Sequence, residues 1–358
     1  MGQQRLQSLD VLRGLTVAGM ILVNNGYRDS FPMLQHAEWN GLTVSDFVFP
    51  FFLFIMGVSL YLSLSKAGLR FSTRVLFKIV KRSVILLAIG VAINWFDMAV
   101  WGGALDFGEL RFWAVLQRIA ICYLIAGIFA LFGKPDLSLP LSVVLIAIYS
   151  IILLVGNGYS QDQHSNILYV VDEWMFGASH LYHKSAVDPE GLLSTICALV
   201  NTLLGFYCGM KMKRGVNLSE KTGNVFMLGT VLVVCGFLLN FFMPYNKHIW
   251  SPSFALATSG ACALLLGLSM KLIDGNGRKG YVKDFFMVFG CNPLLLYVTS
   301  EVMAIVFGRI GVSAWIYDTL SGLIPVGEFA SLAYAICFVC MNYLIGYPLW
   351  KKHVYIKL

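Results

Sequence analysis

Apolar stretches of about 20 residues alternate with short polar segments along the whole chain. Each stretch is long enough to cross roughly 30 Å of hydrocarbon as an α-helix. The pattern predicts an all-α polytopic membrane protein, with one transmembrane domain over residues 1–358 and about ten spans. The expected spans are 9–27, 43–65, 79–97, 112–132, 138–156, 191–210, 223–243, 252–272, 284–308 and 328–350.

The composition agrees with this class of protein. Hydrophobic residues make up 58% of the chain and charged residues 13%, and the mean hydropathy is +0.74, whereas soluble domains are about 25% charged. All eight cysteines fall in apolar stretches, so we expect packing residues rather than disulfide partners. The chain shows no nucleic-acid-binding motif, and the net charge of +7 requires no acidic partner beyond anionic lipid.

The distribution of basic residues predicts the orientation. With the N-terminus inside the cell, 20 of the 26 Lys and Arg residues lie in cytoplasmic segments and five in outer ones, while Arg118 lies within a span. The positive-inside rule therefore places both termini in the cytoplasm. The same orientation puts the segment between the first two spans on the outer face. It also makes 157–190 the one outer connection long enough to form a lid.

The segment between the first two spans carries the strongest candidate for chemistry. His36 can accept a proton near neutral pH or act as a nucleophile. Asp46, at the start of the second span, either forms a capping box with Thr43 or orients and charges the His36 imidazole. Trp39 and Asn40, in the same segment, are candidate acceptor-binding residues.

Four polar residues within the apolar stretches are further candidates. Asn25 ends the first span near His36. Arg13 either anchors the inner end of that span or binds a cofactor. Arg118 is buried at a depth that favours function, and arginine suits a phosphate or a carboxylate, although a structural ion pair is the alternative. Asn292 precedes Pro293 at a break in the ninth span that can face a cavity.

Five other candidates for binding a polar acceptor lie in two outer segments. They are Asp188 and Glu190, which alternatively cap the following helix, and Asn246, Lys247 and Trp250, of which the tryptophan is also typical of a membrane interface. His180 and His183 have the spacing of a metal-binding pair, but the sequence offers no third ligand, so we predict no metal site.

Six motifs in order along the chain resemble the heparan-α-glucosaminide N-acetyltransferase family. They are LDVLRGLTVAGMILVNN, HAEWNGLTVSDFVFPFFLFIMGVS, LQRIAICYL, DPEGLLST, NKHIWSPSF and GCNPLLLY. The resemblance implies a polytopic enzyme that transfers acetyl from cytoplasmic acetyl-CoA to the amino group of a terminal glucosamine on the far side of the membrane. By position, the catalytic histidine of the family matches His36, its active-site asparagine matches Asn25, and the following aspartate matches Asp46.

The resemblance also implies how the donor is bound. The acetyl-CoA nucleotide is expected on the basic side, with its phosphates at Arg118 and the inner basic clusters, and the thioester is expected to reach His36. Either His36 takes up the acetyl group, or it removes the amine proton while Asn25 holds the carbonyl; we favour the second. The chain starts at its first span, so we expect a bacterial-type member in the inner membrane, with a homodimer possible.

Two other functions are compatible with the residues. One is O-acylation of an exported glycan. The other is transport of a polar metabolite through a site formed by Arg118 and the broken ninth span.

Overall fold

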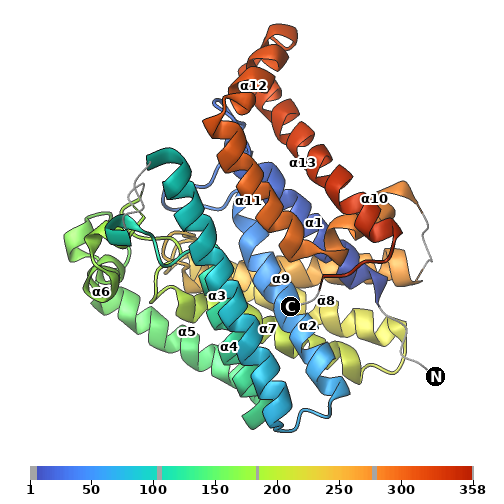
Figure 1. Cartoon of the computed structure of the whole chain (residues 1–358). Helices are drawn as coiled ribbons and strands as arrows, with labels where there is room; N and C mark the ends of the chain where they lie inside the picture. Colours follow the sequence, from blue (N-terminus) through green and yellow to red (C-terminus); the bar gives the residue numbers. More distant parts are fainter. Residues whose placement is uncertain (1–5, 103–106, 183–184, 276–279, 357–358) are drawn as a thin grey trace.

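The computed structural model describes residues 6–102, 107–182, 185–275 and 280–356. Helices and short turns make up the regular structure of these residues, which contain no β-strand (Figure 1). The α-helices are α1 Gln7–Asn24, α2 Val48–Lys66, α3 Thr73–Gly102, α4 Val115–Phe132, α5 Ser138–Val155, α6 Ile167–Phe176, α7 Thr195–Arg214, α8 Leu218–Asn240, α9 Pro252–Ser269, α10 Tyr281–Cys291, α11 Pro293–Arg309, α12 Val312–Leu323 and α13 Gly327–Lys351.

Each predicted span overlaps a helix, so the all-α polytopic class is confirmed. Among the described residues, seven helices are long and apolar enough to cross a membrane, and an eighth span results if α10 and α11 are counted together. The prediction of ten spans is therefore not confirmed in number. The predicted span 284–308 is two helices bent by 82° at Asn292, because Pro293 lacks the amide hydrogen that would continue the helix. Two short helices, α6 and α12, were not predicted.

Glycines let the helix backbones approach closely where the bundle is tightest. A Cβ atom placed on Gly57 of α2 would lie 2.0 Å from the Thr202 carbonyl oxygen of α7. A Cβ atom on Gly205 of α7 would lie 2.0 Å from the Phe54 carbonyl oxygen of α2. Small residues at such crossings are the usual way that helices pack in a membrane. The α2–α7 pair forms a fixed frame for the residues at its ends.

The alternating direction of the helices gathers the candidate residues at one end of the bundle, which we call the polar end. The N-termini of α2, α4, α7 and α9 meet there, as the ring contact between Phe49 and Trp250 shows. The opposite end, which we call the basic end, holds the C-termini of α2 and α7, where Lys213 donates to the Ser65 carbonyl and Arg214 pairs with Asp136. The assignment of the basic end to the cytoplasm stays a prediction from the charge distribution.

Candidate functional site

His36 and Asp46 form a hydrogen-bonded pair at the polar end. His36 Nδ1 lies 2.8 Å from Asp46 Oδ1. The Asp46 side chain is fully buried, whereas the His36 side chain is 42% exposed. Since a carboxylate can only accept, Nδ1 carries the proton that it donates to Asp46, and Nε2 is left as the basic nitrogen. The pair therefore presents a proton acceptor at an accessible surface.

Asp46 fulfils both roles that the sequence allowed. Its Oδ2 accepts from the Thr43 amide at 3.0 Å, in the predicted capping box, and from the Ala37 amide at 3.3 Å. Its Oδ1 remains for His36. Because α2 begins directly after this turn, the carboxylate lies near the positive end of the helix. The cap fixes the carboxylate, and the carboxylate fixes the imidazole.

Lys247 is the third charged group of this cluster. Its Nζ lies 2.8 Å from His36 Nε2 and 3.8 Å from Asp46 Oδ1. Burial lowers the pKa of Lys247, although Asp46 and Glu190 act in the opposite direction. The lysine ammonium therefore lies against the His36 ring in this structure, 3.0 Å from Nδ1 as well as 2.8 Å from Nε2.

Aromatic and amide side chains frame the cluster. The rings of Trp39 and His248 are stacked with centroids 5.5 Å apart, and the Trp39 indole donates to the Tyr159 carbonyl. Asn246 Nδ2 donates to Asn40 Oδ1 at 3.1 Å, which joins the loop before α2 to the turn before α9. The predicted acceptor-binding residues of the two loops are thus brought together beside His36.

A network of buried charges lies on the other side of Lys247. Arg111 donates to Asp188 Oδ1 at 2.5 Å and to Glu190 Oε2 at 2.9 Å. Burial raises the pKa of Asp188 above its usual value despite the ion pair with Arg111. Burial also acts to raise the pKa of Glu190, but the cations Arg111, Arg118 and Lys247 outweigh it and hold that pKa below its usual value. Sequence reasoning missed Arg111, which it counted only as an outer-loop cation.

Arg118 belongs to the polar end and does not line the cavity described below. It lies in the first turn of α4, donates to the Gly191 carbonyl at 2.9 Å and to the Ser194 hydroxyl, and covers the Trp250 ring at 4.9 Å. The Trp250 indole donates in turn to Asn201. Arg118 and Trp250 are both fully buried, so here they join α4, α7 and α9.

Asn25 ends α1 close to a second polar group. Its Nδ2 donates to the Ile21 carbonyl at 2.7 Å, and the residue is 8% exposed. The neighbouring Asn24 side chain lies near Glu301 of α11. An amide nitrogen has two hydrogens, so the Asn25 side chain keeps a second N–H donor.

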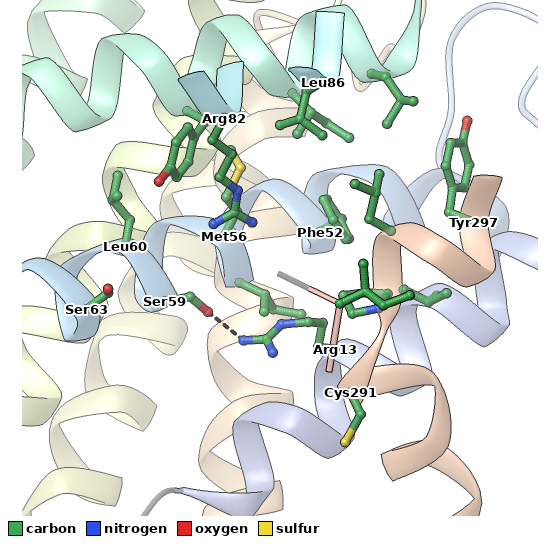
Figure 2. A pocket seen from close by; sticks show the side chains of 18 of the residues that line it. Arg13, Phe52, Met56, Ser59, Leu60, Ser63, Arg82, Leu86, Cys291 and Tyr297 are labelled. Atoms are coloured by element: carbon green, nitrogen blue, oxygen red, sulfur yellow. Dashed lines mark hydrogen bonds between the residues drawn. The ribbon is translucent and has the colours of Figure 1, made fainter. Parts of the chain in front are cut away.

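A cavity of about 350 Å³ lies between α1, α2, α3, α4 and the start of α11. It follows one face of α2 from Phe52 to Leu64, a distance of roughly 18 Å at 1.5 Å per residue. Figure 2 shows Arg13 and Arg82 on opposite sides of it, with Arg13 donating to the Ser59 hydroxyl at 2.7 Å. Arg13 was predicted as a cofactor-binding residue. Arg82 was not singled out, but it belongs to the inner basic clusters that were expected to bind the phosphates, and it shares a helix face with the buried Ile79 and Leu86.

Asn292 acts on the wall of this cavity through the C-terminal segment. Its Nδ2 donates to the Val354 carbonyl at 2.9 Å, and its Oδ1 accepts from the Ile356 amide at 2.8 Å. Tyr355 and Ile356 line the cavity, whereas Asn292 does not. The side chain therefore fixes a segment that lines the cavity.

No group of three or more potential metal ligands occurs among the described residues. His180 Nδ1 lies 2.7 Å from the Leu110 carbonyl, to which it donates. His183 lies outside the described residues, so the pair that it could form with His180 is not tested.

Fold and site together define a class of polytopic membrane protein. It has a histidine–carboxylate pair at one end of the bundle and an arginine-lined cavity along α2, the helix that follows this pair in the chain. Residues 5–171 match the family model described as heparan-alpha-glucosaminide N-acetyltransferase, catalytic. The chain is related to this family, as its motifs predicted.

Two curated relatives extend the match over most of the chain. Heparan-alpha-glucosaminide N-acetyltransferase of Homo sapiens is 30% identical over 355 residues, which cover 83% of this chain and 53% of that protein. The protein of the same name from Mus musculus is 29% identical over 356 residues, with coverages of 84% and 54%. The chain thus spans about half the length of the curated relatives it matches.

Proposed function

We propose that the protein is a transmembrane acetyltransferase that transfers acetyl from acetyl-CoA to the amino group of a glucosamine-type sugar. The His36–Asp46 pair carries the proposal, because a buried carboxylate that fixes the imidazole leaves Nε2 as a general base. The names of the two relatives support the reaction class and the amino-sugar acceptor. The distribution of basic residues supports an orientation with the acceptor on the outer side of the membrane.

The cavity supports a route for the donor. Arg13 and Arg82 are the cations that line it, so we assign the acetyl-CoA phosphates to them rather than to Arg118. The pantetheine arm then extends along α2 toward the polar end. Phe52, at the end of the cavity, is six residues from Asp46, roughly 9 Å along the chain. The thioester has to cross that distance to meet the acceptor.

The reaction then needs one proton acceptor and one carbonyl donor. The acceptor amine displaces Lys247 from His36 Nε2, gives up a proton to this nitrogen and attacks the acetyl carbonyl. The second N–H of Asn25 donates to the carbonyl oxygen as negative charge develops on it. The sugar site is formed or supported by Trp39, Asn40, Asp188, Glu190, Asn246 and Trp250. Direct transfer requires no acetyl-histidine.

The test uses detergent-solubilised protein with isotopically labelled acetyl-CoA and glucosamine. We expect a labelled amide, identified by mass spectrometry, and no product from His36→Ala, which should still bind acetyl-CoA. His164→Ala is the matched control, because His164 is exposed in an outer loop away from the pair, and it should keep full activity. An ester product would instead indicate O-acylation. Uptake into vesicles without a covalent product would indicate a transporter, and retained turnover in His36→Ala would refute the role of His36.

A further inference from the structure

A polar pair on α11 closes the end of the cavity that is nearest to the polar end. In Figure 2, Ser63, Ser59, Met56 and Phe52 follow one another along α2, and Tyr297 lies beyond Phe52. Tyr297 lines the cavity there together with Leu116, which is in the first turn of α4. The reactive end of a donor whose phosphates lie at Arg13 and Arg82 would therefore lie beside the Tyr297 hydroxyl.

Glu301 lies one helical turn further along α11 than Tyr297 and interacts electrostatically with its hydroxyl. The Glu301 carboxyl also lies near the Asn24 side chain, next to the candidate catalytic Asn25. An ionisable residue within an apolar helix is costly and usually functional. The mechanism above leaves both Tyr297 and Glu301 without a role.

We propose that Tyr297 and Glu301 form the proton donor for the thiol group that leaves acetyl-CoA, an inference that rests on the proposed acetyl transfer. The site takes a thioester as its ligand, with the sulfur atom next to the Tyr297 hydroxyl. Glu301 positions the Tyr297 hydroxyl and supplies the proton that replaces the one given to sulfur.

The chemistry balances as follows. The amine nitrogen forms a bond to the acetyl carbon, the bond from that carbon to sulfur breaks, and the electron pair goes to sulfur. Tyr297 gives its hydroxyl proton to the sulfur and regains one from the Glu301 carboxyl, while His36 keeps the proton of the amine. A thiolate would be costly in a cavity lined by Phe52 and Leu116, because apolar surroundings disfavour a bare charge. After the step His36 gives the amine proton to solvent and Glu301 takes one proton from solvent, so the two transfers balance.

The charges around the pair come from three elements. Asp97 of α3 acts on Glu301, and Glu190 and Arg111, from segments on either side of α4, act on Tyr297. Two of these three neighbouring groups are carboxylates and one is a cation.

The experiment compares two donors whose leaving thiols differ in acidity, acetyl-CoA and S-phenyl thioacetate. Because the aryl thiolate is stable without a proton, it does not need the Tyr297 hydroxyl. We expect Tyr297→Phe to lower kcat with acetyl-CoA about 100-fold and to lower the rate with S-phenyl thioacetate less than about threefold. It should also reduce the solvent deuterium isotope effect on kcat to the part that arises from proton transfer to His36. Tyr281→Phe is the control, because Tyr281 is exposed at the start of α10 and does not line the cavity, and it should change neither.

Glu301→Gln keeps a hydrogen-bonding group of the same size and tests supply of the proton. Its kcat with acetyl-CoA should fall and the rate with S-phenyl thioacetate should persist. Binding of labelled CoA to both variants establishes that they are folded. An equal loss with both donors, or an unchanged kcat in Tyr297→Phe, would overturn the inference while the wild type still transfers acetyl. A wild type that transfers no acetyl from either donor would overturn the proposed function, and this inference with it.

Discussion

The polar end and the cavity hold their charges in different ways. At the polar end, Asp46, Asp188 and Glu190 are buried and are each matched by a cation within 4 Å. In the cavity, Arg82 lies over the Tyr123 ring, and Arg13 is paired with Asp10 on its own helix. The polar end thus balances its charges within the protein, whereas the described residues that line the cavity include two arginines and no acidic side chain.

This difference suggests a division of work between the two regions. A preorganised cluster can stabilise charge that develops during a reaction, because its dipoles need no rearrangement. A cavity lined by arginines instead binds an anion that arrives and leaves. The comparison predicts that substitutions at the polar end affect turnover or folding, and that substitutions in the cavity affect the affinity for the donor.

The largest expected effect comes from Asp46→Asn. The amide preserves the shape of the side chain but cannot stabilise a protonated imidazole, and its NH₂ group can reverse the hydrogen bond and select the wrong tautomer of His36. We expect kcat for acetyl transfer to fall about 10²–10³-fold, with little change in KM for acetyl-CoA.

Glu38→Gln is the control, because Glu38 lies in the same segment and is exposed. A similar loss in both variants would show that charge in the segment matters rather than the contact with His36. A fully active Asp46→Asn enzyme would show that acetyl transfer does not depend on the preorganised His36–Asp46 pair.

The next effect is on folding and concerns Arg111→Ala. This change leaves Asp188 and Glu190 buried without their shared cation, which costs about 3–5 kcal/mol for a broken buried ion pair. We expect a much lower midpoint of thermal unfolding in detergent. Arg28→Ala removes an exposed ion pair with Asp318, in which both side chains are more than half exposed, and it should cost at most about 1 kcal/mol. Equal costs would contradict the contrast between balanced buried charges and screened surface charges.

The sequence predicted the features that depend on local patterns. Hydropathy located the helices, and the order Thr43, Asp46 identified the capping box that the structure contains. The proximity of His36 to Asp46 could be expected because both lie in one short segment. The loop 157–190 was expected as a lid, and the structure adds that it contains α6, whose Asp172 accepts from the Leu192 amide.

Features that depend on partners far along the chain were not predictable in this way. Arg111 is bonded to residues 77 and 79 positions away, and periodicity carries no information about such a choice. Arg118 was assigned to phosphates because of its depth, but its position in the first turn of α4 brings it to Gly191 and Ser194 at the polar end. The angle of 82° at Asn292 depends on tertiary packing, since Pro293 permits a break without fixing its direction.

A smaller effect is expected for the cavity, from Arg82→Ala. Loss of one phosphate contact should raise KM for acetyl-CoA about tenfold, leaving kcat and KM for the acceptor nearly unchanged. Arg74→Ala, two turns earlier on α3 and exposed, should leave all three constants unchanged. If Arg82→Ala lowered kcat instead, the cavity would belong to the reacting site, and the division between the two regions would not hold.

The smallest expected effect is a dependence of stability on pH that arises at the polar end. Burial raises the pKa of Asp172 from 3.8 to about 7, although its bond from the Leu192 amide opposes the shift. The folded protein therefore holds this proton between about pH 4 and 7 where the unfolded chain has lost it, so this contribution to stability falls as pH rises through that range. Asp172→Asn removes the titrating group. Its unfolding midpoint should exceed that of the wild type by roughly 2–4 °C at pH 8, with the difference shrinking toward pH 4.

Asp162→Asn, at an exposed position in the same loop, should not alter the pH dependence. The contrary outcome is an unfolding midpoint that rises from pH 4 to 7 equally in the wild type and in Asp172→Asn. It would show that Asp172 is ionised in the folded protein and that its charge is balanced, as are those of the other buried carboxylates at the polar end.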